Sequence, residues 1–420
     1  MFCGHGKPPL NLFVTPLIKE ILHLRSIGFL YRNVRVKIGK IIFVCDAVAR
    51  AFLQCIRSHA AAYGCGYCRS KGRYISNRIV YPTKSGALRC DEEYAIFKEN
   101  NQTSLSPIQA ITGLLSGFPV DYQHAALLGV VRRLFLFYFS SVKGFRLRCK
   151  VPFNNLTVLS DRSVQLAPFI PSDFQRRPRR FDTELKHFKA CEFRMFVLYL
   201  GPFLFKEFLP KRYYDNFILL HFSLYVFCSE RLCALRPHAE YCLQRFVSEI
   251  PKLFGEAAVS YNFHILLHLP YFVDLYGVCD SFSAFPFESF LGNLKRRTKK
   301  TRFYFEHSIS QLEAIRSSDI NSKRCSQPLF SVSRPNNCAL FDGSTVVIIK
   351  SISPDGMVVS GHRLHFLRDL YTYPYPISSI GIGFYRSAED SDRVISGRPS
   401  GKAICIPVKK DFLVLPLSSS

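Results

Sequence analysis

One stretch decides the expected fold: VRVKIGKIIFVCDAVARAFLQC, residues 34–55. Its first part alternates polar and apolar residues and then becomes the apolar run IIFVC, a pattern typical of a buried strand. Its second part begins the run AVARAFLQCIRSHAAA (47–62), which indicates a helix. Asp46 therefore falls at a strand-to-helix junction, where its carboxylate would lie at the edge of a predicted sheet.

The sequence around this stretch indicates four regions. Residues 8–30 have a helical pattern that ends where Gly28 would cap the helix. Apolar runs broken by Pro and Arg clusters predict helices after residue 90, and short β-rich runs separated by Pro, Gly and Ser predict an all-β unit near the end. The expected regions are part of a core at 1–90, a helical insertion at 91–255, a return to the core at 256–325 and a small β domain at 331–420.

The charge of the chain calls for an anionic partner. Its 420 residues include 56 Lys and Arg against 31 Asp and Glu, a formal charge of +25, and residues 1–90 contain only two acids, Glu20 and Asp46. Such a surplus favours nucleic acid or an acidic membrane, with a solvated basic surface as the alternative. Hydrophobic residues make up 48% of the chain, which excludes a disordered protein.

The cellular compartment is predicted from what the sequence lacks. Its N-terminus has no hydrophobic segment of the signal-peptide type, and its longest apolar runs, such as 217–228, are about a dozen residues, too short to cross a bilayer. We therefore expect an intracellular protein with no membrane partner. In that setting the 15 Cys are expected to be free thiols or metal ligands rather than disulfides.

Two pairs of residues suit a metal ion. Cys65 and Cys68 form a CxxC pair whose two thiolates can reach one ion, although two incidental Cys remain an alternative. His264 and His268 are four residues apart, so a helix would place both imidazoles on one face, although each also fits a buried core histidine. Together the four would make a closed tetrahedral site for structural Zn²⁺.

The carboxylates suggest a second kind of site. Asp46, with Glu288 at the start of a later predicted helix, resembles the arrangement with which DNA-cutting enzymes hold two Mg²⁺ ions. Asp121 and His124 offer a further pair that would support them, although Asp121 taken alone fits better as an aspartate that caps a helix. A basic run follows Glu288 and suits phosphate contacts or a nuclear localisation signal, with a solvated helix face as the alternative: Lys295, Arg296, Arg297, Lys299, Lys300 and Arg302.

Six blocks of the sequence, in order, resemble the transposases of CACTA (En/Spm-like) DNA transposons. Val48 and Phe188 stand where that pattern carries Pro and Trp. The blocks are GKPPLNLFVTPLIKEILHLRSIGF (6–29), VCDAVARAFLQC (44–55), GCGYCRSKG (64–72), VDYQHAALLGVVRRL (120–134), PSDFQRRPRRFDTELKHFKACEFRMFVLYLGP (171–202) and NFHILLHLPYFVDLYGVCDSFSAFPFESFLGNLKR (262–296).

The resemblance implies an α/β fold: an incomplete RNase H-like core, a large helical insertion and the small C-terminal all-β unit. It implies DNA cleavage and strand transfer in the nucleus, with Asp46 and Glu288 as the second and third catalytic acids that bind Mg²⁺. It also matches the CxxC and HxxxH pairs to the family's zinc ligands. The expected partner is DNA, and a second copy of the chain is left open.

One expected catalytic acid has no counterpart. The resemblance places the first acid upstream of the GKPP segment, where this sequence has only MFCGH. We therefore expect a truncated gene model or a decayed or domesticated derivative, and an inactive protein, because two-metal chemistry needs the full ligand set. The alternative function is a non-catalytic, zinc-containing nucleic-acid-binding protein.

Overall fold

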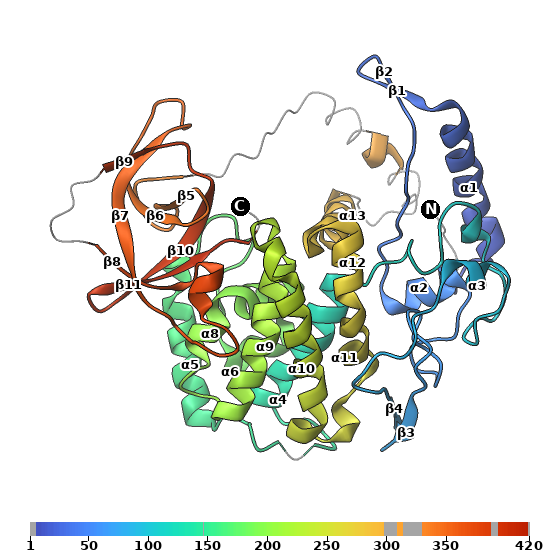
Figure 1. The fold of residues 1–420 in the computed structure, drawn as a ribbon, viewed down its shortest axis with the longest axis horizontal. Helices are drawn as coiled ribbons and strands as arrows, with labels where there is room; N and C mark the ends of the chain where they lie inside the picture. The colour runs from blue at the N-terminus through green and yellow to red at the C-terminus, as the bar shows by residue number, and fades with distance from the viewer. Residues whose placement is uncertain (1–5, 146, 298–308, 314–329, 388–393, 419–420) are drawn as a thin grey trace. The chain divides into compact units, whose positions relative to one another are not determined.

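The computed structural model describes residues 6–145, 147–297, 309–313, 330–387 and 394–418 (Figure 1). The chain divides into two compact units, each made of two separate stretches of sequence. Unit 1 comprises Met1–Ala125 and Ser260–Ser326, and unit 2 comprises Ala126–Val259 and Gln327–Ser420. The stretches expected to form the core, 1–90 and 256–325, therefore belong to unit 1 apart from residues 256–259.

Unit 1 contains short helices and two small antiparallel hairpins. Its hairpins are β1 (Phe29–Tyr31) with β2 (Val34–Val36), and β3 (Arg73–Ile75) with β4 (Arg78–Val80). Its first stretch carries helices α1 (Leu10–Ile27), α2 (Ala47–Gln54), α3 (Asp91–Ala95) and η1 (Pro107–Ala110), and the π-helical η2 (Gln123–Val131) begins near its end. Its second stretch carries α11 (Tyr261–Ile265), η8 (Leu266–His268), α12 (Leu269–Tyr276), η9 (Cys279–Phe282) and α13 (Phe285–Arg297).

The first of the two helices predicted near the N-terminus is confirmed. The second, predicted over 47–62, is confirmed only as Ala47–Gln54, because Cys55 adopts a left-handed conformation that ends it. α1 ends at Gly28, whose φ of 72° lies in the left-handed region and whose N–H donates to the Leu24 carbonyl. A Cβ on Gly28 would lie 2.7 Å from the Val36 carbonyl oxygen, so the close return of β2 also requires glycine. α2 begins after Asp46, which caps it by accepting a hydrogen bond from the Ala49 N–H at 2.7 Å.

The strand predicted over residues 34–45 is wrong for most of its length. Only Val34–Val36 is a strand, and it pairs with β1. Residues 41–45 are half-buried and have no regular secondary structure; the Phe43 N–H donates to the Gly117 carbonyl instead. An apolar run becomes a strand only beside another strand that completes its ladder, and the described part of unit 1 places none beside residues 37–45. The RNase H-like core therefore stays a prediction.

Unit 2 is largely helical, and its core is rich in phenylalanine. Every residue of α9 from Asn216 to Phe227 is buried, so the apolar run 217–228 forms a buried helix. No helix among the described residues has the length and apolar character needed to cross a membrane. The described helices of unit 2 are α4 (Arg132–Phe139), α5 (Phe153–Gln165), η3 (Ala167–Phe169), α6 (Phe181–Glu184), η4 (Leu185–His187), α7 (Ala190–Met195), η5 (Phe196–Leu200), α8 (Gly201–Leu204), α9 (Lys211–Phe227), η6 (Glu230–Leu235), α10 (Arg236–Phe254), η7 (Glu256–Ala258) and η10 (Ile377–Ile380).

Phe188 shows how this core is built without tryptophan. Its ring stacks on Phe196 with a centroid distance of 5.8 Å and an interplanar angle of 8°. The Arg179 guanidinium lies 5.2 Å from the centre of the Phe188 ring. Phenylalanine has no N–H to satisfy, so this packing needs no polar partner.

The C-terminal strands of unit 2 form one antiparallel sheet in the order β6-β5-β10-β11-β8-β7-β9 (Figure 1). An additional pairing of β6 with β7 closes six of the strands into a ring, and β9 adds to the outside of β7. The strands are β5 (Cys338–Phe341), β6 (Thr345–Ile352), β7 (Val359–Arg368), β8 (Gly383–Ser387), β9 (Val394–Gly397), β10 (Gly401–Val408) and β11 (Asp411–Pro416).

Contacts inside unit 2 join this sheet to the helices. The Tyr225 hydroxyl on α9 donates to the Pro416 carbonyl at 2.6 Å, and the buried Lys402 ammonium on β10 pairs with Asp173 at 2.8 Å. The predicted start of the β domain at residue 331 thus marks a change from helices to strands within unit 2.

Candidate metal centre and acidic pocket

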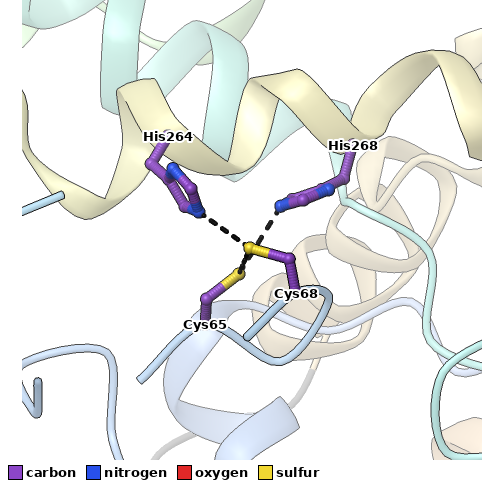
Figure 2. A group of neighbouring side chains, drawn as sticks. All are labelled: Cys65, Cys68, His264 and His268. Atoms are coloured by element: carbon purple, nitrogen blue, oxygen red, sulfur yellow. Dashed lines mark hydrogen bonds between the residues drawn. The ribbon is translucent and has the colours of Figure 1, made fainter. Parts of the chain in front are cut away.

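The CxxC pair lies in a knuckle that backbone hydrogen bonds hold closed. The Arg69 N–H donates to the Ala87 carbonyl at 2.9 Å, and the Arg89 N–H donates to the Tyr67 carbonyl at 3.0 Å. Gly64 enters the knuckle, and a Cβ there would lie 2.4 Å from the Ser58 carbonyl oxygen. These constraints turn the Cys65 and Cys68 thiols to the same side of the knuckle (Figure 2).

The HxxxH pair approaches from the second stretch of unit 1. His264 lies on α11 and His268 ends the short 3-10 segment η8, so the chain tightens between them, with both imidazoles directed at the thiols (Figure 2). The His264 Nδ1 is 2.9 Å from the Pro82 carbonyl oxygen, which only accepts hydrogen bonds. His264 therefore carries its proton on Nδ1, and its Nε2 lone pair is available to a metal.

The distances between the ligand atoms of the cluster fit tetrahedral coordination of one ion. The Sγ atoms of Cys65 and Cys68 are 3.7 Å apart, Cys68 Sγ is 3.3 Å from His264 Nε2, and Cys65 Sγ is 3.5 Å from His268 Nε2. Zn–S bonds of about 2.3 Å and Zn–N bonds of about 2.0 Å at tetrahedral angles separate two sulfurs by about 3.8 Å and a sulfur from a nitrogen by about 3.5 Å. This buried Cys₂His₂ cluster can hold a metal ion, and its geometry is compatible with zinc.

The protonation of the cluster also fits an ion. Burial raises the pKa of the Cys65 thiol well above its ordinary value, whereas the hydrogen bond with Cys65 lowers the pKa of Cys68. Burial lowers the pKa of His268, which keeps its imidazole neutral. A divalent cation replaces the thiol protons and binds neutral imidazoles, so it relieves the cost of burying these groups.

Buried polar side chains behind the cluster were not found from the sequence. Arg89, with 2% of its surface exposed, forms an ion pair with Glu99 at 2.5 Å and donates from Nε to the Cys65 carbonyl at 3.0 Å. Asn101 Nδ2 donates to the same carbonyl at 3.3 Å. These contacts fix the backbone that carries Cys65. Residues 64–90 are rich in Lys and Arg, and nothing in their sequence distinguishes the buried Arg89 from its exposed neighbours.

The carboxylates expected to be catalytic lie around His124. Asp46, Asp121 and His124 line one cavity of about 310 Å³. The exposed Glu288, on α13, does not line it, but its Oε1 is 3.1 Å from His124 Nε2, and its Oε2 accepts a hydrogen bond from Gln123. His124 thus links the cavity that Asp46 borders to Glu288.

Asp121 is bound by the protein on both of its oxygens. Oδ1 accepts the N–H groups of Gln123 at 3.2 Å and Ala284 at 3.0 Å. Oδ2 accepts the His124 N–H at 3.1 Å and a hydrogen bond from the His124 ring. Asp121 therefore caps η2, as the alternative interpretation held, and also binds the residue before α13. Its hydrogen bond raises the pKa of His124, with a further contribution from Glu288.

The basic run is described only in part. Lys295, Arg296 and Arg297 lie exposed on the last turn of α13, and Arg296 donates to the Asn293 side chain. The other members of the run, Lys299, Lys300 and Arg302, lie outside the described residues.

Comparison with known proteins adds no relative: no family model, no curated protein and no solved structure matches the chain. The resemblance to CACTA transposases therefore stays a prediction.

Proposed function

We propose that the chain is a zinc-stabilised DNA-binding protein derived from a CACTA-type transposase, and that it does not cleave DNA. The ancestral activity would be metal-dependent DNA cleavage and strand transfer. The Cys₂His₂ cluster is the observation that carries this proposal. Its two halves are the CxxC and HxxxH pairs that the resemblance matched. Although Cys68 and His264 are 196 positions apart in the sequence, the distance from Cys68 Sγ to His264 Nε2 is 3.3 Å.

Zinc would be a structural ion in this protein. Cys65, Cys68, His264 and His268 would hold it with two thiolates and two neutral imidazoles, a closed set with no position left for substrate. Because the thiolates come from the first stretch of unit 1 and the imidazoles from its second stretch, the ion would cross-link the two.

The distribution of charge supports DNA as the partner. Fifteen Lys and Arg lie within residues 1–90 against two acids. Lys295, Arg296 and Arg297 add exposed positive charge on α13 of the same unit. Neutralising DNA phosphates releases counterions, and this release drives sequence-independent binding. A role on chromosomal DNA makes the nucleus the proposed location.

The contacts of the carboxylates favour binding without cleavage. A two-metal nuclease needs carboxylate oxygens that Mg²⁺ ions can share, and Asp46 and Glu288 would be those ligands in an active enzyme. Here Asp46 caps α2, and Glu288 is engaged on both oxygens by Gln123 and His124. Asp121, whose oxygens accept four hydrogen bonds, is not available to complete the set.

Titration of a fluorescent DNA duplex at several salt concentrations tests the proposal. We expect salt-dependent binding by the zinc-loaded chain that survives both Asp46→Ala and Glu288→Ala, and no cleavage with Mg²⁺ or Mn²⁺. Replacing Lys295, Arg296 and Arg297 by Gln should flatten the plot of log affinity against log salt by about 0.9 for each phosphate that the variant no longer neutralises.

A matched variant replaces Lys143, Lys186 and Lys211, three exposed lysines of unit 2, by Gln. It removes the same total charge and should leave the slope closer to that of the wild-type chain. Absence of salt-dependent binding would overturn the proposal. Metal-dependent cleavage that Asp46→Ala abolishes would instead show a working nuclease.

A further inference from the structure

Arg50 is a buried cation without a carboxylate partner. It lies on α2 with 4% of its surface exposed and lines the same cavity as Asp46. No ion pair is formed by Arg50 with any described acidic residue, whereas the buried Arg89 and Lys402 pair with Glu99 and Asp173. A buried charge without a counter-charge is unfavourable, so this position calls for an anion from outside the chain.

The nearby metal centre does not supply that counter-charge. A divalent ion bound by two thiolates and two neutral imidazoles has a net charge of zero. The face of the Tyr67 ring, 4.4 Å from the Arg50 guanidinium carbon, offers a weak cation–π contact but no full negative charge. Neither the metal-loaded Cys₂His₂ cluster nor the Tyr67 ring therefore supplies Arg50 with a counter-charge.

Two tyrosines extend this positive group toward the cavity. Arg50 donates hydrogen bonds from Nη1 to the Tyr67 hydroxyl and from Nη2 to the Tyr261 hydroxyl. Each hydroxyl accepts from the guanidinium, so its own hydrogen remains to be donated, and no acceptor for it is recorded among the described residues. Both tyrosines are buried and line the cavity, so the two O–H groups are donors that a ligand there can use.

The acidic residues of the cavity do not neutralise these donors. Asp121 already accepts four hydrogen bonds from Gln123, His124 and Ala284. Asp46 is exposed at the start of α2, where water solvates its carboxylate. Arg50 and the two tyrosine hydroxyls are therefore donors that these carboxylates do not use, in a cavity that His59 and His124 also line.

We propose that Arg50 and the hydroxyls of Tyr67 and Tyr261 form a binding site for a phosphate group in this cavity. A phosphate offers several acceptor oxygens and forms charge-assisted hydrogen bonds with a guanidinium and with neutral donors. A volume of about 310 Å³ holds a phosphate and leaves room for the molecule that carries it. The phosphate can come from a nucleic-acid strand, which rests on the proposed function, or from a free phosphate or nucleotide, which does not.

Phosphorus NMR titration of inorganic phosphate with the zinc-loaded full chain tests the site. Tyr67→Phe and Tyr261→Phe each remove one donor and keep the ring, and each should weaken phosphate binding at least about tenfold. Arg50→Lys keeps the charge but cannot bind both hydroxyls, and should weaken it further. Tyr81→Phe is the matched control, because Tyr81 is also buried but donates to the Ala61 carbonyl and does not line the cavity.

Zinc content and circular dichroism establish that each variant is folded. Equal phosphate affinity in the wild-type chain and a folded Tyr67→Phe/Tyr261→Phe double variant overturns the site, as does the absence of phosphate binding at millimolar concentration in the wild-type chain.

Competition with a DNA duplex and with a nucleoside monophosphate separates the two sources. Displacement of phosphate by the duplex assigns the site to nucleic acid. Displacement by the nucleotide alone assigns it to a small ligand. If the duplex does not bind at all while the tyrosine variants lose phosphate, the proposed function fails and the phosphate site stands. If the duplex binds but inorganic phosphate does not, the proposed function stands and the phosphate site fails.

Discussion

Unit 1 holds two groups of potential metal ligands that differ in what their donor atoms contact. In the Cys₂His₂ cluster, the ligand atoms of all four residues are buried and lie within 4.8 Å of one another. In the acidic group, the oxygens of Asp121 and Glu288 are directed at protein donors, and Asp46 accepts from the start of its own helix. The first group converges on a point, whereas the second group holds helices together.

This difference shows what makes a set of side chains a metal site. Four ligand atoms with few other partners leave an ion as the best way to satisfy them, and second contacts such as His264 Nδ1 to the Pro82 carbonyl hold them in place. Carboxylates whose oxygens already accept N–H groups gain less from an ion, because binding it would cost them those hydrogen bonds. We therefore expect the two groups to respond very differently to substitution.

The largest expected effect is the loss of the metal centre. Cys65→Ser should abolish stoichiometric zinc and lower the free energy of unfolding by on the order of 5 kcal/mol or more, because metal binding in such sites contributes directly to folding. Zinc content by mass spectrometry and denaturant unfolding measure the two quantities. A chelator should reproduce the effect in the wild-type chain.

Cys90→Ser is the matched control for this substitution. Cys90 precedes α3 and does not belong to the Cys₂His₂ cluster. Zinc retention and stability in this variant should match the wild-type chain. A wild-type chain without zinc, or a Cys65→Ser variant that keeps it, would contradict the predicted metal centre.

The next largest effect comes from the buried ion pair behind the thiolates. Arg89→Gln removes the buried partner of Glu99, which keeps only its ion pair with the partly exposed Arg69, and it removes a donor to the Cys65 carbonyl. It should cost about 3 kcal/mol of stability. Because Arg89 positions the backbone of a ligand, zinc affinity should also fall by about 10–100-fold. Chelator competition measures this affinity.

A surface pair supplies the comparison for Arg89. Arg162 and Glu207 form an ion pair at 2.6 Å, with 49% and 69% of their side-chain surfaces exposed. Arg162→Gln should cost at most about 1 kcal/mol and leave zinc affinity unchanged. If both arginine variants lose the same stability and neither loses zinc affinity, Arg89 is not part of the support for the metal centre.

Local pattern was enough to predict some features of unit 1. The spacing of Cys65 and Cys68, and of His264 and His268, predicted the four candidate ligands, because the members of each pair are only three or four positions apart. The end of α1 at Gly28 followed from glycine's access to positive φ, and the helix after Asp46 followed from its apolar spacing. The types and number of ligands suggested that the two pairs share one ion, and the family resemblance strengthened this prediction, since nothing local links residues so far apart.

Other features depend on distant partners and were missed or wrong. The apolar run 41–45 reads as a strand, but a strand needs a neighbour, and these residues have no such neighbour in the described part of unit 1. The contacts of Asp121 with Ala284, and of Arg50 with Tyr261, join residues 163 and 211 positions apart. No periodicity or motif within either segment predicts them, because only the tertiary fold brings the segments together.

The smallest expected effect is the pH dependence that His124 contributes. Its hydrogen bond with Asp121, aided by the charges of Glu288 and Asp46, raises its pKa above the ordinary value of about 6.5. A histidine whose pKa is higher in the folded state than in the unfolded state stabilises the fold fully below the unfolded pKa, and this stabilisation is lost as pH rises through the folded pKa. The unfolding free energy of the wild-type chain minus that of His124→Gln should therefore be largest in mild acid and fall toward alkaline pH.

Repeating the His124→Gln comparison in the Asp121→Asn variant shows whether the pH dependence comes from the Asp121–His124 pair. Because it removes the first cause of the raised pKa, the difference in unfolding free energy between Asp121→Asn and the Asp121→Asn/His124→Gln double variant should vary less with pH. Taking differences cancels the titration of the thiols, which is common to all four chains. A wild-type difference that grows as pH rises would show that Asp121 does not hold His124 in its charged form, and the acidic group would then lack the interaction that joins the start of η2 to Glu288.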